Sequence, residues 1–254
     1  SGNGKKPLVL LHGFMENTTI WNEMEAHLSK DFTLIKIDLP GHGKSKVYQE
    51  IHTVELMAEK VKEVIDALKL EKINLLGHSL GGYVSLAFAE KFPEILESMT
   101  LFFSTTVADD EEKKEIRRRS IAVIDENFET FVKTSIPNLF SNNEKDILEG
   151  KIELAKNIAK STDKEGVKAA QLGMAERPDR TEILENLDAK ILIIAGKYDN
   201  AVKTENLLKI IPEKTNIKIY VLDCGHNGHW EKPTICAEII NTELLHNLPK
   251  HFLL

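Results

Sequence analysis

The sequence is poor in the features that mark several classes of protein. It has two cysteines, Cys224 and Cys236, too few for a disulfide framework or a cysteine-rich metal site. No apolar run approaches the roughly 20 residues that span a bilayer, and no basic and apolar leader opens the chain. The net charge of −7 argues against nucleic acid or an anionic membrane as a partner. We therefore expect reduced, structural cysteines and a cytoplasmic location.

What remains is the composition of a globular domain. The chain has 254 residues, of which 42% are hydrophobic and 29% are charged. This length allows a full hydrophobic core and suits a single α/β domain with an insertion. The sequence contains no internal repeat and no low-complexity linker.

Short apolar runs alternate with helical patterns along most of the chain. Runs that are apolar on both faces are typical of parallel strands covered by helices. The expected strands cover residues 7–11, 33–38, 73–77, 98–103, 190–195 and 217–222. The expected helices cover residues 18–30, 53–70, 79–92, 204–211 and 234–248. This alternation predicts an α/β fold with a doubly wound, mostly parallel sheet and helices on both faces.

The alternation breaks once, between residues 104 and 185. No strand pattern occurs there, whereas four helical patterns do, at residues 109–125, 128–135, 143–160 and 163–176. Ligands of doubly wound sheets bind at the carboxyl ends of the strands, so a helical insertion between two strands would cover them. We expect a core domain of residues 1–103 and 186–254 and an all-helical lid of residues 104–185.

The pentapeptide Gly77-His78-Ser79-Leu80-Gly81 has the pattern G-x-S-x-G. An apolar strand precedes it and a long helical pattern follows it. At such a junction the serine is held in a strained conformation, and the flanking glycines avoid collisions of a Cβ atom. The alternative role for Ser79 is a helix N-cap, which is common for serine. The pattern favours Ser79 as a nucleophile.

A serine hydroxyl attacks a carbonyl group only when a base takes its proton and a carboxylate orients that base. Asp199 and His226 each lie in the loop after a predicted strand. Because the carboxyl ends of parallel strands meet at one edge of the sheet, these side chains can converge on Ser79. His229 is an alternative candidate for the base. If the acid instead follows the predicted strand 98–103, Asp109 is the nearest carboxylate.

Four motifs resemble those of the α/β-hydrolase superfamily, in particular its lidded, esterase-like serine hydrolases. Residues 12–14 (HGF) resemble the oxyanion loop, and residues 38–45 (DLPGHGKS) resemble the D-x-P-G-x-G-x-S turn beside the site. Residues 225–233 (GHNGHWEKP) resemble the closing G-H-x4-E-x-P motif, which favours His226 as the base. Residues 175–179 (AERPD) are similar to a segment that often ends the lid.

The resemblance implies a role for each site residue. Ser79, Asp199 and His226 follow one another along the chain in the order of nucleophile, acid and base that the family uses. The backbone amides of Phe14 and Leu80 are expected to form the oxyanion hole. We expect hydrolysis of a small-molecule ester with a small to medium acyl group, without a cofactor or a metal ion.

The resemblance also leaves alternatives open. The same triad serves carbon–carbon bond hydrolases and lyases that act on anionic substrates, and some plant hormone receptors of this fold keep a slow triad. Most members begin with antiparallel strands, whereas only residues 1–6 precede the first strand here. Either the first strands are lost or the sheet has a shorter edge. The oligomeric state, monomer or homodimer, stays open.

Further candidates have weaker signals. Met15, Phe103 and Trp230 are candidates for the acyl pocket, although large apolar residues more often belong to the core. His12 and His78 are expected to hold the loops of the site by hydrogen bonds. The arginines either recognise an acidic substrate group or pair with nearby acids and anchor the insertion. All five fall in the insertion: Arg117, Arg118, Arg119, Arg177 and Arg180.

Overall fold

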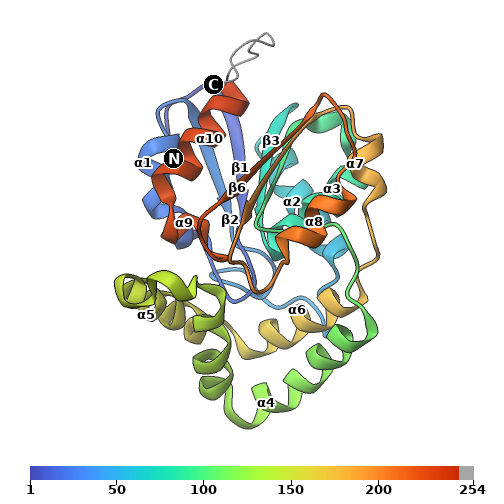
Figure 1. The fold of residues 1–254 in the computed structure, drawn as a ribbon. Helices are drawn as coiled ribbons and strands as arrows, with labels where there is room; N and C mark the ends of the chain where they lie inside the picture. The colour runs from blue at the N-terminus through green and yellow to red at the C-terminus, as the bar shows by residue number, and fades with distance from the viewer. Residues whose placement is uncertain (246–254) are drawn as a thin grey trace.

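A six-stranded sheet forms the centre of the molecule (Figure 1). The computed structural model describes residues 1–245. The strand order is β2-β1-β3-β4-β5-β6, and every neighbouring pair is parallel. The strands are β1 (Lys6–Leu11), β2 (Phe32–Ile37), β3 (Ile73–His78), β4 (Leu96–Phe102), β5 (Lys190–Gly196) and β6 (Ile217–Leu222). The predicted α/β fold with a parallel sheet is confirmed.

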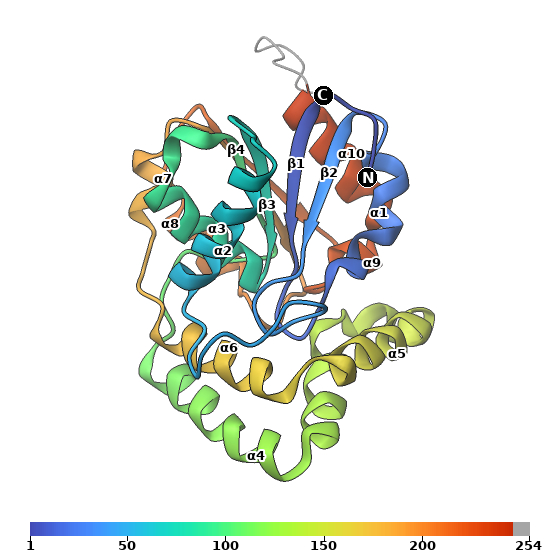
Figure 2. The same ribbon diagram turned by 180° about the vertical axis from the view of Figure 1, so that it is seen from behind.

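Helices cover both faces of this sheet (Figure 2). One face carries α2 (Val54–Ala67), α3 (Leu80–Lys91), α7 (Glu182–Asn186) and α8 (Thr204–Ile210). The other carries α1 (Asn22–Leu28), α9 (Gly228–Glu231) and α10 (Pro233–Leu245). α2 begins after Thr53, because the Thr53 hydroxyl caps the helix by accepting the Leu56 N–H at 3.1 Å. Of the predicted helix 234–248, residues 246–248 lie outside the described part of the chain.

The helical insertion connects β4 to β5. It consists of α4 (Glu111–Ser135), η3 (Ile136–Leu139), η4 (Asn142–Glu144), α5 (Lys145–Ser161) and α6 (Lys164–Glu176). The two helices predicted at 109–125 and 128–135 form the single element α4, with non-helical backbone at Asn127 (φ −156°, ψ 81°). The Asn127 side chain accepts the Thr130 N–H at 2.9 Å and so caps the second half of α4.

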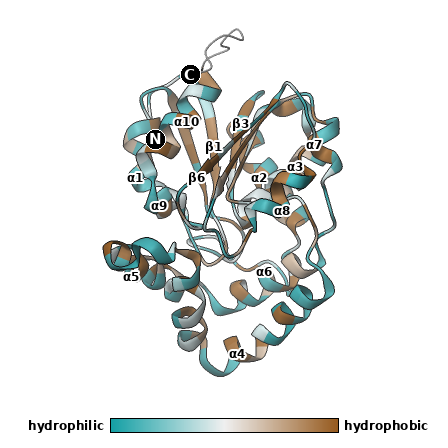
Figure 3. Ribbon diagram, viewed as in Figure 1, coloured by the Kyte–Doolittle hydropathy of each residue, from teal (hydrophilic) through white to brown (hydrophobic). Residues whose placement is uncertain are grey.

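The insertion is packed onto the core. Ile124 of α4 and Ile152 of α5 belong to the same cluster of buried residues as Leu8 of β1 and Ile240 of α10. A second cluster lies on the opposite face, where α2 and α3 cover the sheet. Figure 3 shows hydrophobic residues along the central strands and a mixture of both kinds on the helices of the insertion. The division into a core domain and a lid stays a prediction.

β2 is an outer strand of the described sheet, with the first residue of the chain beside it. The α-amino group of Ser1 donates to the Leu34 carbonyl at 2.9 Å, and the Leu34 N–H donates to the Ser1 carbonyl at 2.6 Å. The first residue therefore occupies one position of the β2 edge.

Cys224 and Cys236 are both buried, with free thiols. Burial raises the pKa of Cys224 and raises that of Cys236 to about 12, so both thiols are protonated at neutral pH. Among residues 1–245, no helix combines the length and the apolar character that crossing a membrane requires.

Candidate active site

Ser79 stands between β3 and α3 in a strained backbone conformation. Its φ of 50° and ψ of −109° lie in a region that side-chain-bearing residues rarely adopt. The turn is so tight that a Cβ on Gly77 would overlap the Gly81 carbonyl oxygen, and one on Gly81 would overlap that of Leu11. The Ser79 side chain makes no capping hydrogen bond to α3. The N-cap alternative therefore does not describe this residue.

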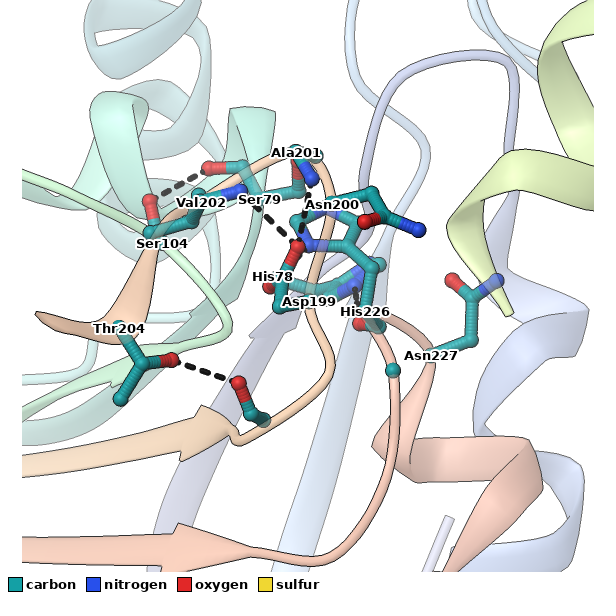
Figure 4. Close-up of polar contacts among 12 residues, drawn as sticks. His78, Ser79, Ser104, Asp199, Asn200, Ala201, Val202, Thr204, His226 and Asn227 are labelled. Carbon is teal, nitrogen blue, oxygen red and sulfur yellow. Dashed lines mark hydrogen bonds and ion pairs between the residues drawn. The ribbon is translucent and has the colours of Figure 1, made fainter. Parts of the chain in front are cut away.

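His226 and Asp199 form a buried pair in the loops after β6 and β5 (Figure 4). Nδ1 of His226 lies 2.7 Å from Oδ2 of Asp199. Oδ1 of the same carboxylate accepts the backbone N–H groups of Ala201 at 2.8 Å and Val202 at 2.9 Å. These contacts orient the carboxylate, and the carboxylate in turn fixes the imidazole with its hydrogen on Nδ1. Nε2 is then free to accept a proton.

Ser79 and His226 line one cavity of about 580 Å³, which the strand ends and the insertion enclose together. In the described chain, no hydrogen bond joins the Ser79 hydroxyl to His226; such bonds are often long before a substrate is bound. The apolar lining comes from both parts of the molecule: Phe14, Met15, Tyr83, Ile116, Phe131, Leu139 and Met174. The charged lining is Glu16, Asp110, Glu112, Lys113, Arg117 and Lys203.

Two backbone amides beside the elbow are free to donate. Within the described residues, neither Phe14 N–H nor Leu80 N–H donates to another group of the chain, so both are available to a negatively charged oxygen. His12 holds the loop that carries Phe14. Its Nε2 accepts the Leu39 N–H at 2.9 Å, and its Nδ1 donates to the Gly13 carbonyl at 2.7 Å. Burial lowers the pKa of His12, so the ring makes these bonds in its neutral form.

Glu231 holds the loop that carries His226. Its carboxylate accepts the backbone N–H groups of Gly225 at 2.8 Å, Asn227 at 3.1 Å and Ser141 at 3.1 Å. Ser141 belongs to the insertion, so the same carboxylate also ties the insertion to this loop. The spacing of the closing motif therefore places the buried Glu231 carboxylate where it accepts hydrogen bonds from the loop of His226.

His229, the rival for the base, has a different environment. It is fully buried and has no hydrogen-bond partner among the described residues. Its ring packs against the rings of Trp230 and His78, with distances between ring centroids of 4.3 Å and 4.7 Å. Burial lowers its pKa well below the usual value, so it is neutral. His229 is not in the lining of the cavity that holds Ser79.

Arg177 and Arg180 anchor the end of the insertion. The Arg177 guanidinium donates to Asp109 at 2.9 Å and stacks over the Tyr83 ring at 3.9 Å from its centroid. Arg180 donates to carboxylates on α2 and α3. Arg117 lines the cavity and donates to Asp109 at 2.5 Å. Asp109, the alternative acid, is therefore paired with two arginines rather than with an imidazole.

The described lining of the cavity includes Met15 but neither Phe103 nor Trp230. The Phe103 ring is buried edge-on to His226, with 6.5 Å between centroids. Trp230 stacks on Phe140 of the insertion, with ring planes 10° apart. Both side chains fill the core beneath the site, as large apolar residues commonly do. The insertion contributes lining residues instead, for which the sequence carries no motif.

Glu16 is a buried carboxylate that the motifs did not single out. Its Oε2 accepts the Gly13 N–H at 2.5 Å and lies 2.8 Å from Nδ1 of His78. Glu16, His78 and His229 offer ligand atoms within 4.8 Å of one another, a spacing that a metal ion can bridge. Glu16 and His78 already use these atoms for one another, so we treat them as an ion pair and not as metal ligands. The sequence offered one signal for Glu16, which was its position three residues after Gly13 of the H-G-F loop.

The sequence matches the α/β-hydrolase fold family over residues 6–233. The chain belongs to this family of enzymes. An esterase from Thermogutta terrifontis, solved with malate bound, is 32% identical to this α/β hydrolase. The two structures superpose with a TM-score of 0.90 over 96% of this chain and 91% of the other. The family predicted from the motifs is confirmed.

Curated relatives differ in how much of the α/β hydrolase they match. A putative 2-succinyl-6-hydroxy-2,4-cyclohexadiene-1-carboxylate synthase from Bacillus subtilis is 28% identical over 94% of this chain and 90% of its own. An uncharacterized protein from Mycobacterium tuberculosis is 36% identical over 108 residues, which cover 42% of this chain. Those residues span only 32% of the mycobacterial protein.

Proposed function

We propose that this α/β hydrolase cleaves carboxylic esters through a covalent acyl-enzyme. One observation carries the proposal: Ser79, on its strained turn, lines the same cavity as His226. Nδ1 of this histidine is held 2.7 Å from Oδ2 of Asp199. The esterase relative at 32% identity supports an ester as the substrate.

The proposed reaction has two halves that share one imidazole. His226 takes the hydroxyl proton of Ser79 through Nε2 while Oγ attacks the carbonyl carbon of the ester. The amides of Phe14 and Leu80 donate to the tetrahedral oxyanion, and His226 then passes the proton to the leaving alcohol. A water molecule, deprotonated by the same imidazole, attacks the acyl carbon. The bond from this carbon to Oγ then breaks, Oγ takes the proton back from His226, and the acid is released. Asp199 keeps Nδ1 protonated and stabilises the imidazolium in both halves.

The cavity supports a small or medium, mainly apolar acyl group. Its volume of about 580 Å³ falls within the range of roughly 300–1,000 Å³ that small-molecule sites occupy. Apolar side chains contributed by the core and by the insertion surround it. The proposed partner is therefore a small-molecule ester.

A second candidate keeps the triad but changes the reaction to carbon–carbon cleavage or elimination on an anionic substrate. The Bacillus subtilis relative, named as a carboxylate synthase, favours it. The charges of the site weigh against it. Of the charged lining residues, Glu16 is paired with His78 and Arg117 with Asp109, which leaves two carboxylates (Asp110 and Glu112) and two lysines (Lys113 and Lys203). Arg177 and Arg180 are also already paired with carboxylates.

Replacement of the nucleophile tests the proposal. We expect Ser79→Ala to lower kcat for p-nitrophenyl butyrate by about 10³-fold or more, because no other group forms the acyl-enzyme. Ser161→Ala, at the end of α5, is the matched control and should keep full activity. The preferred acyl length is measured with a series of p-nitrophenyl esters.

Unchanged hydrolysis by pure Ser79→Ala protein would show that the mechanism is wrong. A protein that turns over no ester of the series but orders its insertion when a ligand binds would instead be a receptor with a slow triad. A product from a carboxylated diketone but not from any ester would favour carbon–carbon cleavage.

A further inference from the structure

The His78 ring has a hydrogen-bond acceptor at each of its nitrogens. Nε2 lies 3.0 Å from the backbone carbonyl oxygen of His226 (Figure 4), and Nδ1 lies 2.8 Å from Oε2 of Glu16. A carbonyl oxygen only accepts, so Nε2 carries a hydrogen. Oε2 of Glu16 also accepts the Gly13 N–H at 2.5 Å, as an ionised carboxylate does. Nδ1 then donates as well, and a ring that donates from both nitrogens is an imidazolium.

The surrounding charges agree with this protonation state. Burial opposes ionisation of Glu16, but the charge of His78 and its hydrogen bond outweigh burial and lower the pKa of Glu16 to about 2. Burial also opposes a charge on His78, but Glu16 and the His226 carbonyl outweigh it and raise the pKa of His78. Two of the ionisable rings nearby, His12 and His229, are kept neutral by burial. The carboxylate of Asp199, beyond His226, adds to the attraction.

We propose that Glu16 and His78 form a buried carboxylate–imidazolium pair that positions the three loops of the acyl-transfer site. The proposal rests on the ester hydrolysis proposed above. The pair bonds to Gly13, the residue before the amide donor Phe14, and to the carbonyl of the base His226. His78 is itself the residue before the nucleophile. Glu16 and His78 are positioning residues, because they act through these neighbours.

The backbone of the first loop is shaped around the pair. Met15, between Phe14 and Glu16, has a φ of 57°, in the left-handed region that non-glycine residues seldom occupy. This conformation turns the chain back so that Glu16 reaches Gly13. A Cβ on Gly13 would lie 2.7 Å from both Oε2 of Glu16 and Nδ1 of His78. Gly13 therefore leaves the space that the ion pair fills.

The pair should affect the transition state more than substrate binding. A donor amide that shifts when the pair is broken loses its bond to the developing oxyanion, which does not exist in the bound ester. Loss of the pair should therefore lower kcat and leave KM nearly unchanged. A smaller folded fraction would also lower the apparent kcat at an unchanged KM, so kcat is calculated from the concentration of folded protein.

The ring nitrogens can be observed directly. In ¹⁵N-labelled wild-type protein at pH 7.5, we expect both His78 ring nitrogens to show the chemical shift of a protonated imidazolium nitrogen. The His78→Gln variant identifies the signals. In Glu16→Gln the ring should change to one protonated and one bare nitrogen. A neutral His78 ring in the wild-type protein would overturn the proposal.

Kinetics supply the second measurement. Glu16→Gln should lower kcat for p-nitrophenyl butyrate by roughly 10- to 100-fold, with KM within about twofold, since a displaced oxyanion donor costs up to that much. The double variant Glu16→Gln/His78→Gln should have a kcat only slightly below that of the less active single variant, because both changes break the same pair. Glu25→Gln, which breaks the surface pair with Lys36, is the control and should leave kcat unchanged.

The outcomes separate this inference from the proposed function. A folded Glu16→Gln protein with wild-type kcat overturns the positioning role even if Ser79→Ala is inactive. Full activity in Ser79→Ala overturns the proposed mechanism, whereas the ring-nitrogen signals still report whether the ion pair exists.

Discussion

At the residue scale, backbone donors orient the carboxylates of the site. Asp199 accepts two amide N–H groups, Glu231 accepts three and Glu16 accepts one. A backbone amide cannot move as a flexible side chain does, so each carboxylate is held in one orientation. The groups bonded to these carboxylates, His226 and His78 among them, take their orientation from the main chain.

Asp199→Asn tests this orientation. The amide has the shape of the carboxylate, but its NH2 group cannot accept the Nδ1 hydrogen, so the wrong tautomer of His226 is favoured. We expect kcat to fall by about 10³- to 10⁴-fold with little change in the Tm. Ester hydrolysis and thermal unfolding are the measurements. Asp223→Asn, which alters only an exposed pair with Lys197, should behave like the wild type; equal losses in both variants would contradict the assignment.

At the element scale, the helices of the insertion differ in how closely they pack. A Cβ on Gly150 of α5 would meet no atom within 4 Å, whereas one on Gly173 of α6 would overlap the His52 carbonyl oxygen. The first glycine therefore lies on an open helix surface. The second is required because the backbone before α2 passes directly against α6.

These two glycines predict opposite effects of one substitution. Gly150→Ala should raise the free energy of unfolding by about 1 kcal/mol, because alanine favours the helix and restricts the unfolded chain. Gly173→Ala should lower it, because α6 must move away from the carbonyl. Urea denaturation of both variants measures the difference, and a stabilised Gly173→Ala protein would refute the close packing of α6.

At the scale of the whole molecule, a buried charge cluster ties the two ends of the insertion together, and its Arg177 stacks over Tyr83 of α3 in the core. Asp109, in the loop between β4 and α4, pairs with Arg117 of α4 and with Arg177 at the end of α6. Burial opposes its ionisation, but the two guanidinium groups outweigh burial and lower the pKa of Asp109 from 3.8 to about 2. The carboxylate therefore stabilises the fold above its unfolded pKa, and this stabilisation is lost as the pH falls toward 2.

Asp109→Asn should remove this contribution. At pH 7 the variant should lose about 2 kcal/mol of unfolding free energy, the equivalent of the pKa difference. The gap between variant and wild type should shrink as the pH falls from about 4 to 2, because the unfolded carboxyl binds its proton first. Urea denaturation across this range checks it. A gap that is independent of pH would show that the carboxylate charge is not its cause.

The insertion shows where prediction from the sequence stops. Its helices were predictable from periodicity, and even the break at Asn127 separated two predicted helices. The lining of the cavity was not, because Phe103 and Trp230 went to the core while Ile116 and Phe131 reached the cavity. All four are large and apolar, and only the tertiary packing distinguishes them.

The parallel sheet, the family and the loops of Ser79, Asp199 and His226 could be predicted from the amino-acid sequence. Strand and helix periods and the glycines of the elbow are local properties, so they can be read along the chain. Only the folded chain shows that Asp109 pairs with arginines, that Glu16 bonds to His78, and which side chains line the cavity. Most of these contacts join residues far apart in sequence, and their partners become definite only when packing brings the segments together.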